Sequence, residues 1–342
     1  MQEAELITID AAHERALILD VLSALGAGER EAADQADVLL EGDLRGRSSH
    51  GVQRLPVIAE RIRRGLIALR AEPVERWTGE AMLSVDGENG FGPHVAFRAA
   101  GAVSERARRT GVAAAAIRRA SHLGILAVYV ERIAAAGQIG IAFTTSEALV
   151  HPWGGRVALV GTNPIAVAMP SGEEPFVLDM ATGAISRGEV LARGLRGEPL
   201  PSGAAVDAEG RPTTDPVAAA AISPSGGAKG FALGLAIELI VAALTGTAVG
   251  EEVRGTLDVT DPVTKGDLLI AFDARGDFAP RLGGYLDALR TSPPAADTPG
   301  VTIPGMRARA ERARRMAEGV PLPAALWREL ESLREREASA RA

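Results

Sequence analysis

The sequence predicts a mixed α/β protein, and three observations lead to this class. From about residue 80 onward, short apolar segments rich in β-branched residues lie between glycine and proline borders, which is typical of strands. Segments with helical spacing lie between them, and this alternation is typical of α/β or α+β domains. The chain has 342 residues, of which 46% are hydrophobic, so it is long enough to bury one large core or two moderate ones.

The first 70 residues predict helices. Residues 29–43 place most of their apolar side chains on one face. Polar residues 45–50 interrupt this pattern, and helical spacing resumes over residues 52–66. Four arginines of this second segment are expected to be solvated unless function recruits them: Arg54, Arg61, Arg63 and Arg64.

The centre of the chain predicts a sheet with intervening helices. The predicted strands span residues 82–85, 112–117, 139–143, 165–169, 176–178 and 268–272. The predicted helices span residues 94–109, 125–136 and 229–245. Residues 194–216 are rich in glycine, proline and aspartate and predict an ordered loop. Residues 292–300 predict a linker, and residues from about 305 to 340 predict a charged amphipathic helix.

Helices therefore flank a mixed central region. We expect residues 1–75 and 300–342 to pack together as one discontinuous helical domain, and residues 76–299 to form a mixed-sheet domain. The longest apolar stretch, 231–244, is interrupted by Glu238 and is too short to cross a bilayer comfortably. We therefore expect a buried core helix there, and no association with a membrane.

Composition argues against several classes of function. The net charge of −7 opposes nucleic-acid binding, because a protein that binds phosphates needs a basic face. The chain has no cysteine, which excludes disulfides, thiolate nucleophiles and cysteine-ligated metal sites. Its acidic beginning, MQEAELITID, lacks the apolar core of a signal peptide, so we expect a cytoplasmic protein.

The common nucleotide-binding motifs are missing. No G-x-G-x-x-G follows a predicted strand, and the nearest glycine cluster, Gly87, Gly90 and Gly92, has the wrong spacing. The stretch SGGAKG contains a lysine but lacks the Gly-Lys-Ser/Thr order of a phosphate-binding loop. A Rossmann fold and a nucleoside-triphosphatase are therefore poorly supported.

Two of the five histidines lie in unusual surroundings. His50 follows Arg47-Ser48-Ser49, and helical spacing would put it on the same face as Arg54. His122 comes just after a predicted strand and two residues before Gly124, a position that favours a cleft, although a hydrogen-bonded turn would explain it equally. No two histidines form a compact pair of the H-E-x-x-H kind, so no metal site is expected.

Histidine and arginine together suit the reduction of a carbonyl next to a carboxylate. Hydride addition to C=O builds negative charge on oxygen, and a group that titrates near neutrality can supply the proton. The planar fork of an arginine holds a carboxylate with two parallel bonds. Arg54 is the candidate for this clamp, and a solvated surface charge is the alternative.

Nine short motifs follow one another along nearly the whole chain. They are Asp43-LRGRSSHGVQRL-Pro56, Asn89-GF-Gly92, Ser121-HL-Gly124, Pro152-WG-Gly155, Gly161-TN-Pro164, Asp179-MA-Thr182, Gly210-RPTTD-Pro216, Lys229-Gly230 and Ile303-Pro-Gly305. In this order they resemble the malate/L-lactate dehydrogenase family of the second type. That family includes ureidoglycolate and sulfolactate dehydrogenases, diketogulonate reductase and piperideine-2-carboxylate reductases.

The resemblance implies a fold peculiar to this family, usually in a homodimer, in place of a Rossmann fold. The helical domain would carry the substrate and dimer contacts. The mixed-sheet domain would hold the cofactor, NAD or NADP, without the glycine fingerprint. A small 2-oxo or 2-hydroxy acid of the malate or lactate type is the implied substrate.

The resemblance also implies roles for individual residues. His50 matches a proposed proton donor, His122 a general base and Arg54 a contact to the substrate carboxylate, with Ser49 and Thr145 as further substrate contacts. Lys229 would meet a cofactor phosphate as a point charge. The implied cofactor-binding residues are His122, Thr162, Asn163, Asp179, Met180, Ala181, Thr182, Gly183, Lys229, Gly305, Met306 and Arg307.

Four positions depart from the family pattern. Serine is usual where Gly183 stands, asparagine where Thr145 stands, an acidic residue where Met306 stands, and an aromatic residue where Leu123 stands. These changes leave open the substrate side chain, the direction of the reaction and the choice between NAD and NADP. Two alternatives also stay open: reduction of a cyclic imine carboxylate, and a non-catalytic binding homologue.

Overall fold

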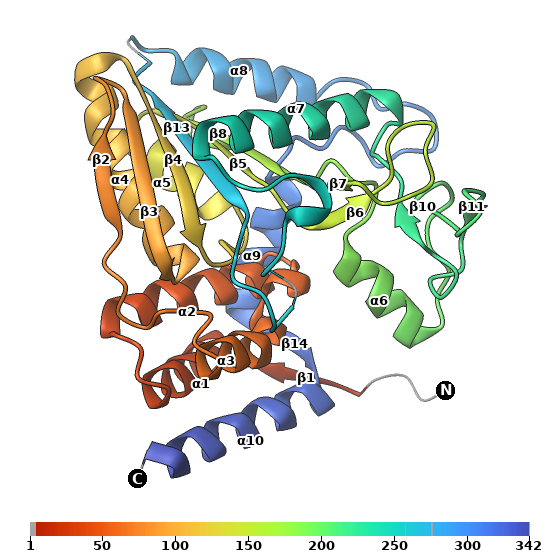
Figure 1. The fold of residues 1–342 in the computed structure, drawn as a ribbon. Helices are drawn as coiled ribbons and strands as arrows, with labels where there is room; N and C mark the ends of the chain where they lie inside the picture. Colours follow the sequence, from red (N-terminus) through yellow and green to blue (C-terminus); the bar gives the residue numbers. More distant parts are fainter. Residues whose placement is uncertain (1–4, 257, 275, 342) are drawn as a thin grey trace.

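The computed structural model describes residues 5–256, 258–274 and 276–341 (Figure 1). It is a mixed α/β structure, as predicted, with one large sheet, one small sheet and a two-stranded pairing of the chain ends. The large sheet has the strand order β2-β3-β4-β13-β5-β8-β9, and within it only β3 and β4 run parallel. Its strands are β2 (Val74–Trp77), β3 (Met82–Gly90), β4 (Val112–Ala120), β5 (Ile139–Thr144), β8 (Ile165–Met169), β9 (Phe176–Met180) and β13 (Gly266–Phe272).

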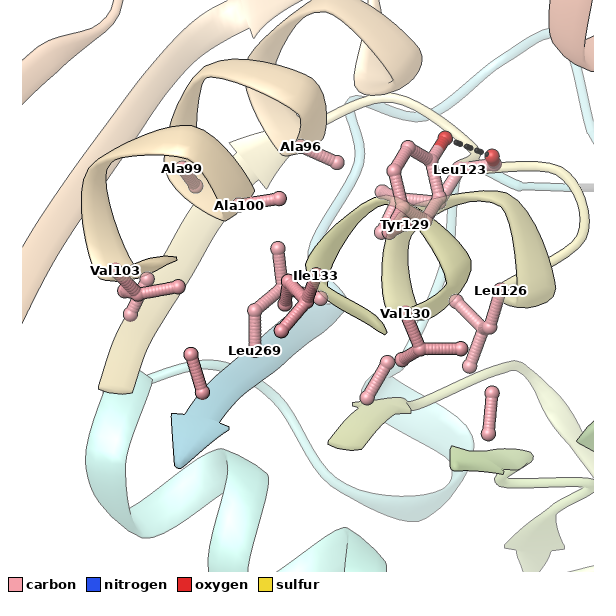
Figure 2. Packing of buried hydrophobic residues seen from close by; sticks show 14 of the residues in the cluster. Ala96, Ala99, Ala100, Val103, Leu123, Leu126, Tyr129, Val130, Ile133 and Leu269 are labelled. Atoms are coloured by element: carbon pink, nitrogen blue, oxygen red, sulfur yellow. Dashed lines mark hydrogen bonds between the residues drawn. The ribbon is translucent and has the colours of Figure 1, made fainter. Parts of the chain in front are cut away.

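Helices cover both faces of this sheet, because its central strands are apolar on both sides. Helices α4 (Gly92–Thr110) and α5 (Ala127–Ala135) pack on one face, and α7 (Ala228–Thr245) packs on the other. Alternate residues of β4 serve the two faces: Ala113 and Ala115 join the cluster under α4 and α5, whereas Ala116 meets α7. Figure 2 shows how small side chains of α4 let it lie close to α5 and β13.

The two ends of the chain form a helical group. Strand β1 (Leu6–Ile9) pairs antiparallel with β14 (Val320–Pro323). Side chains from both ends, among them Leu17, Leu39 and Leu330, belong to one hydrophobic cluster. The helices of this group are α1 (Ala11–Ala24), α2 (Glu29–Leu44), α3 (Leu55–Arg63), α9 (Met306–Glu318) and α10 (Ala324–Arg341). That this group acts as one domain with the limits given above remains a proposal.

The small sheet lies beside α6 (Arg187–Arg196). It has the order β11-β10-β12-β6-β7 and is built from very short strands. These are β6 (Ala148–Val150), β7 (Val160–Gly161), β10 (Ala205–Val206), β11 (Pro212–Thr213) and β12 (Ala221–Ile222). Most of the predicted loop 194–216 is irregular, but it begins inside α6 and contributes β10 and β11.

Several predicted elements need correction. The first 70 residues are not all helical, because β1 precedes α1, and α8 (Ala279–Arg290) was not predicted. The predicted C-terminal helix is broken between α9 and β14 at Gly319, which has φ +94°. A side chain there would lie 2.5 Å from Thr8 and so block the pairing of β14 with β1.

The apolar helix α7 was predicted to be buried, and this is wrong. Ile237 and Val241 face the sheet, but Leu239 is 54% exposed and Ile240 is 46% exposed. Within the described chain, α7 is the one helix long and apolar enough to cross a membrane by length and composition. Its apolar outer face is therefore a feature that a single chain leaves uncovered.

Candidate active site

Asp43 fixes the backbone of the segment that carries His50 and Arg54. After α2 the chain forms two short 3₁₀ helices, Ser48–His50 and Val52–Arg54, and the helix predicted over residues 52–66 becomes α-helical only from Leu55. The buried Asp43 carboxylate accepts a hydrogen bond from the Val52 N–H at 2.5 Å. Gly51 separates the two turns because a Cβ at this position would overlap that carboxylate. Asp43 therefore fixes the backbone positions from which the His50 and Arg54 side chains extend.

Asp43 shares its buried environment with a second acid, Glu14 on α1. Glu14 is fully buried, and neither of its carboxyl oxygens has a hydrogen-bond partner among the residues that the structure describes. Burial, and next the negative charge of Asp43, raise the pKa of Glu14 well above its usual range. Burial also raises the pKa of Asp43, although its bond from Val52 opposes this. The favoured state of the Glu14–Asp43 pair is therefore one in which at least one of the two carboxyl groups is protonated.

His122 lies on the loop that follows β4, and three hydrogen bonds fix this loop. Gly92 N–H donates to Ser121 Oγ at 2.7 Å, and the Tyr129 hydroxyl donates to the Leu123 carbonyl at 2.5 Å (Figure 2). Gly124 N–H donates to His122 Nδ1 at 3.0 Å. In the neutral imidazole the proton then sits on Nε2, the nitrogen that points to Arg54.

The predicted residues His50, Arg54 and His122 meet. The Nη2 atom of Arg54 is 3.4 Å from Nε2 of His122, and the rings of the two histidines have centroids 5.4 Å apart. Arg54 also donates from Nε to the Ser49 carbonyl at 3.0 Å and from Nη1 to the Thr256 carbonyl at 3.3 Å. Ser49 Oγ is 3.0 Å from Nδ1 of His50. A loop of the helical group and a loop of the sheet therefore build one site.

The environment keeps both imidazoles uncharged at neutral pH. Burial lowers the pKa of His50 to about 4, and the positive charges of Arg54 and Arg47 lower it further. Burial also lowers the pKa of His122 well below 6.5, with the charge of Arg54 as the next cause. Both imidazoles are therefore in the form that can act as a base, although the lowered pKa values make them weak bases in the empty site.

A cavity of about 20 Å³ lies between α3 and the His122 loop, a volume that holds about one water molecule. Its wall includes Arg54, Arg61, Gln35, Ser121, His122 and Thr256. A larger cavity of about 410 Å³ lies elsewhere, between β6, β12 and α6. Among the described residues that line it, Arg187 is the one charged side chain, so the smaller cavity is the better candidate for proton chemistry.

Arg61 was expected to be solvated, and this is wrong. It is 3% exposed, whereas Arg63 and Arg64 on the same helix are exposed as predicted. Its Nη1 donates to the carbonyls of Asp258 at 2.7 Å and Asp261 at 3.2 Å. Its spacing of seven residues from Arg54 was the available signal, because two helical turns return a side chain to the same face.

Thr145, a predicted substrate contact, is buried beside the start of β13. Its hydroxyl accepts a hydrogen bond from the Gly266 N–H at 3.1 Å, and it does not line the small cavity. Next to it, the buried Lys265 contacts both carboxylate oxygens of Asp267 at 2.6 Å. The positive charge of Lys265 also contributes to the low pKa of His122.

Several stretches predicted to bind the cofactor lie together. Thr182 donates to the Thr162 carbonyl at 2.9 Å, and Ser225 N–H donates to the Thr182 carbonyl at 2.8 Å. Asp179 accepts a bond from Ala127 N–H at 2.9 Å, which joins the end of β9 to α5 just beyond the His122 loop. Burial raises the pKa of Asp179 to about 6. Met180 is exposed, and Ala181 and Gly183 are half-buried beside Thr182.

Other predicted cofactor residues differ in accessibility. Lys229 is exposed in the first turn of α7, a helix that begins without a side-chain cap, so its first N–H groups and Lys229 suit an anion such as a phosphate. Gly305 packs against the backbone of β9 at the start of α9, where Met306 is half-buried and Arg307 is exposed. Asn163 is fully buried and bonds Glu238 at 2.6 Å, so its side chain supports the loop from within. The donors present therefore fit a dinucleotide.

Within the part of the chain that the structure describes, no three histidine, aspartate or glutamate side chains are grouped so as to hold a metal ion.

Comparison with known proteins gives one consistent family. A family profile described as malate/L-lactate dehydrogenase matches residues 9–331. The malate/(S)-sulfolactate dehydrogenase of Methanothermus fervidus is 36% identical over 333 residues, which cover 95% of this chain and 96% of that protein. The (2R)-3-sulfolactate dehydrogenase (NADP(+)) of Chromohalobacter salexigens is 36% identical over 319 residues, 92% and 94% of the two chains.

A relative with a different named substrate is equally similar. The Δ1-pyrroline-2-carboxylate reductase 2 of Burkholderia multivorans is 36% identical over 338 residues, which cover 97% of this chain and 98% of that protein. Among solved structures, a dehydrogenase from Sinorhizobium meliloti superimposes with a TM-score of 0.92 at 46% identity, over 97% of this chain and 99% of that chain.

Proposed function

We propose that this chain, which belongs to the malate/L-lactate dehydrogenase family, transfers a hydride between NAD or NADP and a small 2-oxo or 2-hydroxy carboxylic acid. Its relatives are named dehydrogenases and reductases of hydroxy acids or imine carboxylates, and one of them is named for NADP(+). The observation that carries the proposal is the meeting of His50, Arg54 and His122, of which Arg54 and His122 line the small cavity.

Arg54 is the proposed clamp for the substrate carboxylate. Its half-buried guanidinium lies between two loops and now donates to two backbone carbonyls. A carboxylate is a stronger acceptor than a carbonyl, so a substrate that reaches Arg54 competes well for these donors. The carbon next to that carboxylate would then lie beside His122.

Proton transfer is the proposed role of the two histidines. Oxidation of a hydroxy acid removes a proton from the hydroxyl oxygen, and a neutral His50 is ready to accept it, with His122 as the alternative or a second participant. Reduction needs the protonated ring. A bound carboxylate offsets the positive charge of Arg54 and so raises the pKa of both rings toward the working range. Binding of the substrate would thus raise the pKa of the histidine that donates the proton.

The dinucleotide supplies or accepts the hydride when it is bound. The residues proposed to hold it are Lys229 and the start of α7 for a phosphate, together with residues 179–183 and 305–307. Asp179 connects this region to α5 beside the His122 loop through Ala127, so cofactor and substrate would meet at His122.

A cyclic imine carboxylate is the second candidate substrate. The reductase relative from Burkholderia multivorans favours it, with 36% identity over nearly the whole chain. The same arginine clamp suits its carboxylate. An imine that is already protonated when it binds depends less on proton donation by the histidines, so its reduction would persist at higher pH. The third alternative, a non-catalytic homologue, loses support because the candidate catalytic side chains converge.

Assembly and location belong to the same proposal. The exposed apolar face of α7 suits burial against a second copy of the chain, so we propose a homodimer with C₂ symmetry in which α7 of the sheet region contributes to the contact, in addition to the helical group that the resemblance implied. We also propose a cytoplasmic location, a small carboxylic acid as the only partner besides the cofactor and the second copy, and no role in binding nucleic acid or a membrane.

A substrate panel tests the proposed function. Pyruvate, oxaloacetate and Δ1-piperideine-2-carboxylate should be offered with NADH and with NADPH, and dinucleotide binding should be measured separately by calorimetry. We expect binding of at least one dinucleotide, with a higher melting temperature, and turnover of at least one acid. Absence of both binding and turnover with either dinucleotide would refute the enzyme assignment.

A further inference from the structure

We infer that Glu238 is a positioning residue for the dinucleotide: it fixes the turn of residues 161–163 against α7, and this turn fixes Thr182 in the stretch proposed to hold the cofactor. This inference rests on the proposed function. It adds a residue to which the family resemblance assigned no role. Glu238 acts through the residues that it holds and not by touching the ligand.

The first observation is the burial of an acid in an apolar helix. Glu238 is the one acidic residue between Ala228 and Thr245, the limits of α7. Its side chain is 3% exposed, and among the described residues no cation forms an ion pair with it. A buried carboxylate is costly unless hydrogen bonds replace its lost hydration. The bonds that Glu238 accepts therefore indicate what the residue does.

The second observation is that three donors from two loops meet the Glu238 carboxylate. Its Oε2 accepts hydrogen bonds from the Gly161 N–H at 3.1 Å and from Asn163 Nδ2 at 2.6 Å. Its Oε1 accepts a bond from the Gly250 N–H at 2.6 Å. Helix α7 packs beside β7, the strand that ends at Gly161 (Figure 1). A leucine in place of the acid would suit the helix but would leave all three donors without this acceptor.

The third observation is the conformation of the turn that Glu238 holds. Asn163 is fully buried, and its φ of +28° lies in the left-handed region. Its Nδ2 also donates to the Gly234 carbonyl at 3.1 Å, and its Oδ1 accepts a bond from the Ser146 N–H at 3.3 Å. An uncommon backbone conformation persists only where the surroundings hold it. Glu238 accepts the shortest of these bonds, so it is the main anchor of the turn.

The fourth observation connects this turn to the proposed cofactor contacts. The Thr162 carbonyl accepts two bonds from Thr182, one from its N–H at 2.8 Å and one from its hydroxyl at 2.9 Å. The Thr182 carbonyl accepts a bond from the Ser225 N–H at 2.8 Å, and Ser225 lies in the turn that precedes α7 and Lys229. A closed ring of contacts therefore runs from Glu238 through both threonines back to the start of α7.

The ring joins two parts of the site proposed for the dinucleotide, residues 179–183 and the start of α7. A ligand that contacts separate stretches of chain binds more tightly when they are held in place beforehand, because ordering them on binding costs affinity. Loss of Glu238 should therefore weaken dinucleotide binding and change the chemical step little.

Glu238→Gln tests this inference, because it keeps the size of the side chain and turns one acceptor oxygen into an NH₂ donor. The Kd of the dinucleotide that the wild type binds more tightly should rise at least about fivefold. Calorimetry well below the melting temperature of the variant measures this. In steady-state kinetics the KM for the dinucleotide should rise likewise, and kcat at saturation should stay within about threefold of the wild type.

The matched control is Thr245→Val at the other end of the same helix. Thr245 is buried, and its hydroxyl bonds the Val241 carbonyl and the Thr247 hydroxyl, each at 2.7 Å. This variant should lower the melting temperature but leave the dinucleotide Kd within about twofold. A merely structural role predicts that Glu238→Gln behaves in the same way, and that result would overturn the inference.

A second variant, Asn163→Ala, removes the amide that bonds Glu238 and leaves the acid in place. Because Asn163 is fully buried, its side chain affects the dinucleotide only through the turn. The effects of Asn163→Ala and Glu238→Gln on the Kd should be less than additive in the double variant, since both break the same contact. Full additivity would show that Glu238 does not act through the turn.

Hydrogen exchange of the wild type tests the same point without any variant. The amides of Gly161 and Thr162 should exchange slowly before a dinucleotide is added, because the turn is already fixed. Fast exchange that slows only on binding would contradict the inference. A wild type that binds neither dinucleotide would refute the proposed function and this inference with it. A wild type that binds one, with an unchanged Kd in Glu238→Gln, would refute the inference alone.

Discussion

Arg54 and His122 are separated by 68 positions in the chain, yet Nη2 of the arginine lies 3.4 Å from Nε2 of the histidine. Gly124 N–H occupies Nδ1 of the same ring, so in the neutral tautomer the Nε2 proton faces a cation. This is an unfavourable arrangement for the empty site. A carboxylate and a substrate oxygen placed between the two groups would give each of them an acceptor.

Removal of Arg54 separates substrate recognition from chemistry. Its contact to the carboxylate exists in both ground state and transition state, so Arg54→Ala should mainly raise KM, with a smaller fall in turnover. Arg54→Lys should rescue poorly because one ammonium cannot reproduce the planar fork. Dinucleotide affinity should stay unchanged. Steady-state kinetics and calorimetry measure these effects, and an unaltered KM would remove Arg54 from the site.

The two histidines should be unequal in their effect on turnover. Replacement of the residue that transfers the proton by alanine should cost on the order of 10²–10⁴ in kcat. We expect the larger loss for His50→Ala and a loss of at least tenfold for His122→Ala. His13→Ala is the control, since that exposed ring packs on Trp327 and is not part of the cavity wall. Near-normal turnover of both single variants would contradict the mechanism.

The pH dependence of kcat/KM follows from the low pKa of His50. The free enzyme holds this pKa at about 4, so the neutral base is present throughout pH 5–8. For oxidation, kcat/KM should be level over that range and fall only below about pH 5. For reduction, it should rise as the pH falls toward 4, because more of the protonated ring is present. An inflection near 6.5 in both directions would show that His50 is not held in this way.

The buried Glu14 predicts that stability decreases as the pH rises. Its pKa is raised in the folded state above the unfolded value of about 4.5, so its contribution is fully present below that pH and is lost as the pH rises through the folded pKa. Glu14→Gln should raise the melting temperature at pH 8 by ~2 °C or more, equivalent to about 1 kcal/mol. The gain should shrink toward pH 5. Thermal unfolding at both pH values measures it, with the exposed Glu105→Gln as control.

The outer face of α7 predicts the assembly state. Leu239 and Ile240 are about half exposed in a single chain, so burial against a second copy would remove apolar surface from water. Light scattering should report a dimer at micromolar concentration. Leu239→Glu should shift the population toward monomer without loss of the folded far-ultraviolet circular dichroism spectrum. A wild-type monomer at that concentration would refute the dimer.

The sequence predicted best those elements whose signal is local. The apolar run from Val112 to Ile117 indicated a strand, and the strand that formed runs only three residues farther. Strand β1 escaped prediction because its four residues become a strand only by pairing with β14, which lies more than 300 positions away. The burial of α7 was predicted wrongly because composition reports apolarity and says nothing of what covers it.

In the candidate site, too, residues with a local sequence signal were identified, whereas contacts that depend on tertiary packing were not. His50 and Arg54 were identified within one short segment, but their meeting with His122 depends on packing between the helical group and the sheet. Arg61 and Arg64 are the same residue type three positions apart, and one is buried whereas the other is solvated. Arg61 donates to the carbonyls of Asp258 and Asp261, which come from a distant part of the chain and which its own sequence neighbours do not reveal.

The pairing of β1 with β14 has a consequence for biosynthesis. Leu330 and Leu333 complete the hydrophobic cluster that supports α1 and α2, and through Asp43 that cluster supports the His50 segment. A ribosome adds roughly 5–20 residues per second, so the first helices must wait many seconds for these partners. Until then the nascent chain exposes apolar surface of these helices, which favours aggregation. Catalytic competence would therefore arise late in translation, after the sheet has been able to fold.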